Sequence, residues 1–282
     1  MSDRNQLQEV ETAWGPVRYW DVGSGQPVVL VHGLLVNGEL WQEAVDRLVP
    51  RARCITVELP MGAHAAPVGD PHRLTLRAQA EAVAALLDAL ALEKVILVGN
   101  DTGGAVCQLV MAHHPARLAA AVLTSCDTGK HVPPASLRPL LWLARSEPAF
   151  AATLALLRTR LGSKGLASTL AHRWEPDLFG RFLAPSRRRE IRGDLAVFLT
   201  SLPTRALLEA HDGLRSFDQP VVVAWAADDR LYFPTRHGQR LAATFPDGRF
   251  VPVPRSRAFV PLDRPDELVR LVDNLLATPT EA

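Results

Sequence analysis

The chain contains few of the residues that form disulfides or ligate metals. Its 282 residues include three cysteines, Cys54, Cys107 and Cys126. Each lies in an apolar stretch, and no two have the spacing of a metal-binding or redox motif. We therefore expect three buried, reduced thiols, no metal site and no requirement for an oxidising compartment.

Long apolar runs and a strong excess of either charge are also absent. No uninterrupted apolar run reaches the ~18 residues of a membrane-spanning helix, and the N-terminal "MSDRNQLQEV" lacks an apolar signal core. The formal net charge is +1, which does not indicate binding to nucleic acid or to an acidic membrane. We expect a cytoplasmic protein with a small-molecule substrate, no membrane insertion, no nucleic-acid partner and no cofactor; a homodimer stays open.

The first 127 residues alternate short apolar runs with amphipathic segments. Residues Leu76, Ala80, Val83, Leu87 and Leu90 recur at helical spacing and mark one face of a long helix. The apolar runs between such segments are typical of strands buried on both faces; they are "VRYWDVG", "PVVLVHG", "RCITVELP", "KVILVG" and "LAAAVLTSC". This alternation predicts an α/β fold with a mostly parallel sheet and helices on both faces.

The composition changes after residue 127. From 128 to 212 prolines are frequent, the amphipathic pieces have helical spacing, and no buried strand is evident. Strand and helix patterns return with "PVVVAWAADD" and continue to a last helix that begins near Pro265. We therefore predict an α/β core formed by residues 1–127 and 213–282, with a helical cap inserted at 128–212. Such a cap can cover a site at the carboxyl ends of the strands.

The strongest chemical signal is the segment "GNDTG" between a buried strand and a helix. Gly99 and Gly103 flank Asp101 with the spacing of a nucleophile elbow, in which a strained turn projects the central side chain from the sheet. The following helix N-terminus would stabilise negative charge there. The alternative is that Asp101 is only a helix N-cap.

Other residues are placed to assist Asp101. The backbone amides of Leu34, after "VHG", and of Thr102 are candidates for an oxyanion hole. Asp229 follows the strand in "WAADD", where a carboxylate orients a base or, alternatively, caps a helix. Trp142 and other aromatic residues of the insert are expected to line an apolar substrate pocket.

Together, "VHG", "GNDTG", the helical insert, "WAADD" and "PLDRPDEL" resemble the α/β-hydrolase superfamily over about residues 12–277. An aspartate at the elbow is similar to the haloalkane dehalogenase and epoxide hydrolase branch. The resemblance implies that Asp101 attacks carbon and that a histidine before the last helix activates water to hydrolyse the ester. The matching stretch is "SRAFVPLDRP", in which Ala258 occupies the histidine position and Phe259 follows it.

An alanine cannot transfer a proton, so another group must replace this histidine if hydrolysis occurs. His64, in the loop after "RCITV", and His131, at the start of the insert, are the candidates. Clustering of Asp101 with Asp127, Asp229 and Glu58 would instead raise the pKa of one carboxyl and favour acid–base chemistry. Arg257, in place of the usual glycine, favours natural divergence over an alanine introduced to trap an intermediate.

Three hypotheses follow from these residues. The first is a hydrolase that cleaves an ester, epoxide or carbon–halogen bond with Asp101, using His64 as base. The second is a lyase, isomerase or cyclase in which Asp101 shuttles a proton. The third is a binding protein that retains the pocket without the reaction. The only tyrosines, Tyr19 and Tyr232, lie outside the insert, so we do not expect a tyrosine of the cap to protonate a leaving group.

Overall fold

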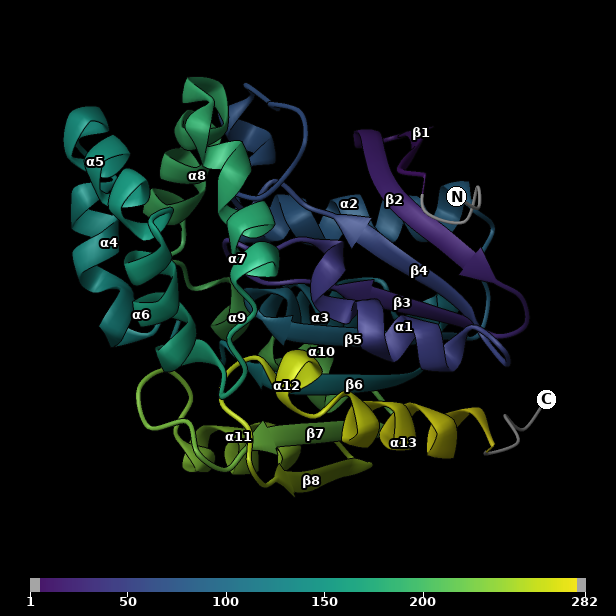
Figure 1. Ribbon diagram of the computed structural model, residues 1–282. Helices are drawn as coiled ribbons and strands as arrows, with labels where there is room; N and C mark the ends of the chain where they lie inside the picture. Colours follow the sequence, from purple (N-terminus) through teal and green to yellow (C-terminus); the bar gives the residue numbers. More distant parts are fainter. Residues whose placement is uncertain (1–5, 278–282) are drawn as a thin grey trace.

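The computed structural model describes residues 6–277, which form one sheet with helices on both faces (Figure 1). The sheet has the strand order β1-β2-β4-β3-β5-β6-β7-β8. The strands are β1 (Gln8–Thr12), β2 (Gly15–Gly23), β3 (Pro27–Val31), β4 (Arg53–Glu58), β5 (Val95–Asp101), β6 (Leu118–Cys126), β7 (Val221–Ala226) and β8 (Gly248–Val253).

The predicted mostly parallel sheet is confirmed. Strands β3 to β8 pair in parallel, and only β1 and β2 run antiparallel to their neighbours. The apolar runs form strands because helices cover both faces of the sheet, so nearly all side chains of the central strands are buried, as for Val28–Val31. The sequence patterns did not reveal β1, because its five residues are mostly exposed at the edge of the sheet.

The helices lie in two layers around this sheet. Figure 1 shows α1 and α13 in front of it and α2, α3 and α11 behind. The α-helices of the core are α1 (Gln42–Leu48), α2 (Leu76–Ala89), α3 (Thr102–His113), α11 (Thr235–Ala242), α12 (Val260–Asp263) and α13 (Pro265–Leu276).

Between β6 and β7 the structure contains helices and no named strand. These are α4 (Arg138–Leu143), α5 (Glu147–Leu157), α6 (Arg160–Leu170), α7 (Pro176–Leu183), α8 (Arg189–Ser201), α9 (Ala206–Glu209) and α10 (His211–Arg215). Figure 1 shows α4 to α8 beyond the carboxyl ends of the parallel strands. The last of these helices, α10, crosses the predicted boundary between cap and core at residue 212 and packs on α3 of the core.

The state of the cysteines agrees with the composition. All three thiols are free and buried, as predicted. No helix within residues 6–277 has both the length and the apolar character to cross a membrane.

Candidate active site

Asp101 ends β5 in a strained backbone conformation. Its φ of 56° and ψ of −131° lie in a region that non-glycine residues rarely occupy. The backbone around the turn is packed too closely for a side chain at either neighbouring glycine. A Cβ on Gly33 would lie 2.3 Å from Asp101 Oδ2, and one on Gly103 would lie 2.2 Å from the Val31 carbonyl oxygen. Only glycine fits at these two positions, and this packing holds the carboxylate at the carboxyl edge of the sheet.

Two backbone amides bind the Asp101 carboxylate. The Leu34 N–H donates to Asp101 Oδ2 at 2.9 Å, and the Thr102 amide is a second donor. Burial raises the pKa of Asp101 to about 7, the two amides oppose this shift, and the charge of Asp229 adds to it. Near neutral pH the carboxyl therefore populates both the acid and the anion.

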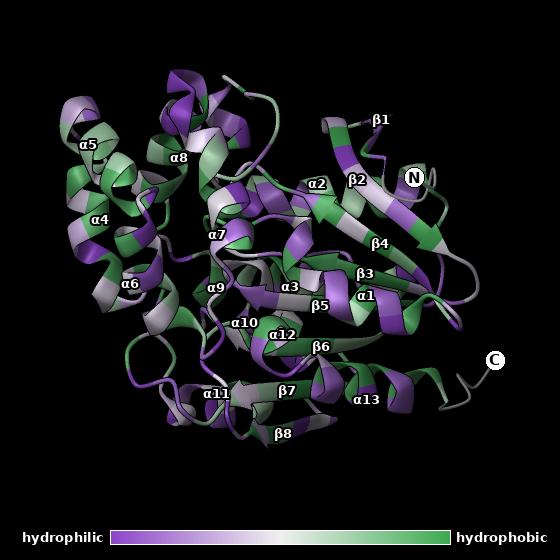
Figure 2. Cartoon of the chain, viewed as in Figure 1, coloured by the Kyte–Doolittle hydropathy of each residue, from purple (hydrophilic) through white to green (hydrophobic). Residues whose placement is uncertain are grey.

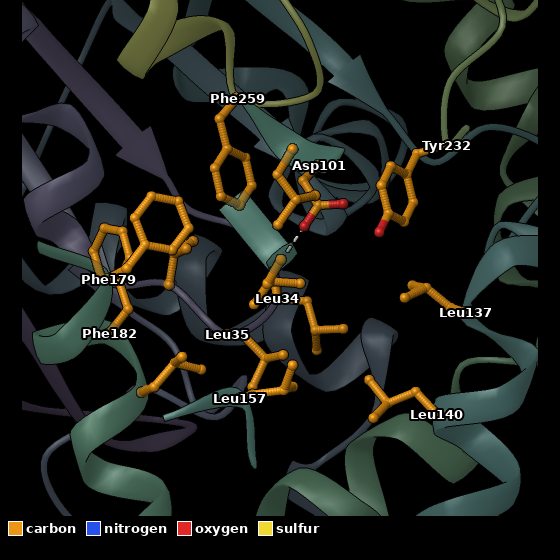
Figure 3. A pocket seen from close by; sticks show the side chains of 14 residues that line it. Leu34, Leu35, Asp101, Leu137, Leu140, Leu157, Phe179, Phe182, Tyr232 and Phe259 are labelled. Carbon is orange, nitrogen blue, oxygen red and sulfur yellow. Dashed lines mark hydrogen bonds between the residues drawn. The ribbon is translucent and has the colours of Figure 1, made fainter. Parts of the chain in front are cut away.

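Asp101 faces a small cavity of about 60 Å³ that lies between the sheet edge and the helices after β6 (Figure 3). Of the 14 side chains that line it, all but two are apolar, and none is a histidine. The apolar lining consists of Leu34, Leu35, Val36, Leu137, Leu140, Leu157, Leu166, Leu170, Phe179, Phe182, Leu183 and Phe259. The cavity suits a small, largely apolar molecule.

Tyr232 is the second polar residue of the lining. Figure 3 shows its ring beside Asp101, with the hydroxyl directed into the cavity. The hydroxyl lies 3.1 Å from Thr169 Oγ1 of α6, and because Thr169 donates to the Leu166 carbonyl, Tyr232 is the donor between them. Burial raises the pKa of Tyr232, so the phenol stays protonated at neutral pH.

The sequence did not identify Tyr232 as a site residue, because the residue lies outside the helical insert. The loop that carries Tyr232 is held next to the cavity by hydrogen bonds to the Asp229 carboxylate. Asp229 Oδ1 accepts from the amides of Leu231 and Tyr232 at 2.9 Å, and Oδ2 accepts from the Phe233 amide at 3.2 Å. The sequence did contain one local signal for this loop. An aspartate side chain often accepts hydrogen bonds from backbone amides a few residues later and so closes a turn, as Asp229 does here.

Asp127 lies beside the elbow, whereas Glu58 does not. The Thr102 hydroxyl donates to Asp127 Oδ2 at 3.1 Å, and Asp127 Oδ1 is buried with no partner among the described residues. Burial, and then the Asp101 charge, raise the pKa of Asp127 well above its ordinary range. Glu58 instead accepts from the Ala65 amide and lines a separate hollow of about 270 Å³, so the expected cluster contains three acids, not four.

His64 is not brought to Asp101, so the expectation that it approaches this carboxylate is wrong. Its Nδ1 accepts from the Gly62 amide at 3.3 Å, and its Nε2 lies 3.2 Å from Asp194 Oδ2 of α8. The ring lines the same separate hollow as Glu58. The Val68 and Gly69 amides donate hydrogen bonds to the Asp194 carboxylate and hold it in place. The His64 ring binds to this fixed carboxylate and not to Asp101.

His131 is also outside the cavity lining, contrary to expectation. Its ring stacks on that of His237 of α11, with centroids 4.0 Å apart. Burial lowers the pKa of His131, and Lys130, Arg236 and Arg240 lower it further. The stacked, neutral ring packs the loop after β6 against α11 and has no contact with Asp101 among the described interactions.

Phe259 lies in the cavity lining, whereas Ala258 and Trp142 do not. Ala258 is fully buried behind the lining, and its carbonyl accepts from Asn100 Nδ2 at 2.8 Å. The prediction for Trp142 is wrong, since its side chain is 70% exposed. It points outward because Leu137 and Leu140 occupy the face of the 135–143 segment that is turned to the cavity.

The sequence is similar to those of known proteins over most of its length. A family model described as the alpha/beta hydrolase fold matches residues 26–265. The chain is similar to haloalkane dehalogenase 2 of Mycobacterium tuberculosis, with 24% identity over 278 residues that cover 95% of each chain. It is also similar to 2-hydroxy-6-oxo-6-phenylhexa-2,4-dienoate hydrolase of Burkholderia cepacia, with 25% identity over 91% of this chain and 90% of that protein.

Solved structures share the architecture. An alpha/beta hydrolase fold protein from Burkholderia ambifaria superposes with a TM-score of 0.82 at 23% identity, over 97% of this chain and 98% of that one. The haloalkane dehalogenase of Bradyrhizobium elkani superposes with a TM-score of 0.79 at 18% identity, over 96% and 97%. At these identities the likeness establishes the fold.

Proposed function

The chain belongs to the α/β-hydrolase fold family, and from this we propose that it is a hydrolase that acts on a small, largely apolar molecule next to Asp101. The observation that carries the proposal is the pairing of two polar groups in an otherwise apolar cavity. A strained elbow carboxylate lies on one side, and a protonated phenol lies on the other. A substrate that fits has an apolar body and one polar reactive group.

We assign the attack on carbon to Asp101 Oδ1. Oδ2 is held by the Leu34 amide, so we take Oδ1 as the oxygen that faces the substrate. The new C–O bond forms as the bond to the leaving atom breaks, and the leaving atom takes the electron pair. Where this atom is oxygen, Tyr232 gives it the phenolic proton.

The Leu34 amide also acts in the second step. After the attack, Oδ2 is the carbonyl oxygen of an Asp101 ester and keeps its hydrogen bond from the Leu34 amide. Water then adds to the carbonyl carbon of the ester, and negative charge develops on Oδ2. The bond from this carbon to the substrate oxygen breaks, that oxygen takes one proton of the water, and the products are an alcohol and the Asp101 carboxylic acid. The acid returns its proton to the Tyr232 phenolate, or to solvent where the leaving atom was a halide. Because no histidine lines the cavity, we expect water attack to be the slow step and the ester to accumulate.

The first experiment follows the oxygen of water. A single turnover in ¹⁸O-labelled water, followed by mass spectrometry of the Asp101 peptide, should place label in the Asp101 carboxylate. Small apolar esters, epoxides and haloalkanes serve as substrates. An unlabelled Asp101 peptide, with full turnover by Asp101→Asn, would exclude the nucleophilic role.

The second experiment tests Tyr232 by comparing leaving atoms. Tyr232→Phe should slow a substrate with an oxygen leaving atom by about 10²-fold. It should change a haloalkane little, since a halide leaves without a proton. Thr169→Val is the matched control, because it removes the hydrogen-bond partner and keeps the phenol. Equal loss with both substrate types would assign Tyr232 to packing alone.

A second candidate is a lyase, isomerase or cyclase that uses Asp101 as acid and base. The pKa of Asp101 near 7 and the lack of a histidine in the lining favour it. Such an enzyme would leave both product and Asp101 free of ¹⁸O and would exchange substrate hydrogen with D₂O. If neither chemistry depends on Asp101, a binding protein is the alternative that survives.

A further inference from the structure

The outer side of α4, α5 and α6 exposes large apolar side chains. Trp142 is 70% exposed, Leu156 64% and Leu161 83%. The exposed residues of α5 between Glu147 and Arg158 are Pro148, Ala152, Ala155 and Leu156, without a charge among them. Large apolar side chains that are exposed on neighbouring helices commonly mark an interaction site.

The inner side of these helices is apolar as well. Leu140 of α4, Leu157 of α5 and Leu166 of α6 line the cavity beside Asp101. Figure 2 shows hydrophobic residues on α4 and α5 at the edge of the molecule farthest from the sheet. An amphipathic helix needs one apolar face to pack on its own protein, so the cavity accounts for the inner residues and leaves the outer ones unexplained.

Basic residues surround the exposed apolar side chains. Arg138, Trp142 and Arg145 are exposed at positions i, i+4 and i+7, so they share one side of α4 and its end. Arg160 and Lys164 flank Leu161 at the start of α6. The one acid nearby in this stretch, Glu147, is paired with Arg192 at 2.7 Å.

The charge of the whole chain conceals this excess. Residues 128–212 contain 13 Lys and Arg against 7 Asp and Glu, which leaves 18 against 23 in the remainder. The helical segment thus carries a formal charge of +6 and the remainder −5, although the total is +1. A basic surface with central Trp and Leu side chains complements an anionic lipid surface.

We propose that the outer face of α4–α6 binds peripherally to anionic lipid bilayers. Trp142, Leu156 and Leu161 enter the headgroup region, and Arg138, Arg145, Arg160 and Lys164 contact lipid phosphates. The same helices lie between that surface and the cavity, so bilayer binding would bring the cavity close to lipid. The binding itself goes beyond the proposed function and is measured without substrate.

The experiment is co-sedimentation of the full chain with vesicles. One set contains phosphatidylcholine alone, and the other mixes it with phosphatidylglycerol. We expect binding to the mixed vesicles only, weakened by salt. Arg138→Gln and Arg145→Gln should each lower the partition coefficient about fivefold, whereas Arg249→Gln on β8 should leave it unchanged.

The apolar contribution has its own variants. Trp142→Ser and Leu156→Ser should reduce binding, whereas Leu231→Ser, at a position 51% exposed outside these helices, should not. Binding to neither vesicle, or equal binding to both, would overturn the proposal. So would a dimer in lipid-free solution that Trp142→Ser dissociates, because the acidic core of a second copy would then be the partner of this face.

Discussion

The Leu34 amide donates a hydrogen bond of 2.9 Å to Oδ2 of Asp101, a residue 67 positions later in the chain. This bond holds Oδ2 of the carboxylate at the elbow. It forms because Gly33 allows the strand–loop junction to approach the elbow closely. Most of the predictions below depend on the burial, the strain or the contacts of this carboxylate.

Replacing Asp101 by Asn should abolish turnover and stabilise the protein above neutral pH. The folded pKa of about 7 lies above 3.8, the ordinary pKa of an aspartate in the unfolded chain, so between these pH values the folded state binds the extra proton. Stability of the parent therefore falls as pH rises through this window, on the order of 4 kcal/mol in all. Urea unfolding should give Asp101→Asn a larger free energy of unfolding than the parent at pH above 7, and this difference should vanish below pH 4.

Asp247→Asn, at an exposed position, is the control for that measurement. It should show no comparable pH-dependent gain. An Asp101→Asn protein that gains nothing at alkaline pH would mean that the carboxyl is not desolvated in the folded state.

The rate should depend on pH through Asp101 alone. If the carboxylate is the nucleophile, kcat/KM rises with pH through a midpoint near 7, since the anion is the reactive form. Asp229 raises the pKa of Asp101 by charge, so Asp229→Asn should move the midpoint to lower pH. Initial rates of both proteins across the neutral range check this, and a rate that falls with pH would assign Asp101 to the role of acid.

The sequence predicts those features of the structure that are determined by residues close together in the chain. The central strands were predicted because burial on both faces leaves continuous apolar runs, as in β6, whose bounds are those of "LAAAVLTSC". The elbow was predicted because Gly99, Asp101 and Gly103 are close in sequence.

Other site features depend on contacts between distant residues. The position of His64 is set by Asp194, 130 positions away, and no local pattern records that contact. Trp142 lies in a helix that is apolar on both sides, so periodicity could not show which side faces the cavity. Tyr232 reaches the site only because Asp229 binds the amides of its loop.

Gly33→Ala should remove activity by displacing Asp101. The new Cβ would lie 2.3 Å from Oδ2 and 2.5 Å from Cβ of Asp101, closer than any real contact. We expect a loss of stability of about 1–3 kcal/mol and of turnover by at least about 10²-fold, because the Leu34 amide can no longer align. Gly193→Ala on α8 has open space and should instead stabilise by about 0.5–1 kcal/mol. Normal turnover by Gly33→Ala would contradict the close approach.

His64→Gln should alter stability more than chemistry. Asp194 would lose its histidine partner, at a cost of about 1–3 kcal/mol, while the cavity lining would stay intact. We expect kcat within a few-fold of the parent and a lower melting temperature, with the same pattern for Asp194→Asn. A large drop in kcat at an unchanged melting temperature would restore His64 as a catalytic base.

Ala258→His tests whether the missing base limits the rate. Ala258 is fully buried next to Asn100, so the larger ring should cost about 1–3 kcal/mol of stability. If an Asp101 ester accumulates in the parent, a general base at this position should speed its hydrolysis by about 10²-fold or more. The parent should show a burst of first product followed by a slow steady rate, and Ala258→His should shorten the slow phase. Ala258→Gln, which adds bulk without a comparable base, should not. An unchanged steady rate in a folded Ala258→His protein, with no burst in the parent, would show that no ester builds up and would favour the acid–base reaction.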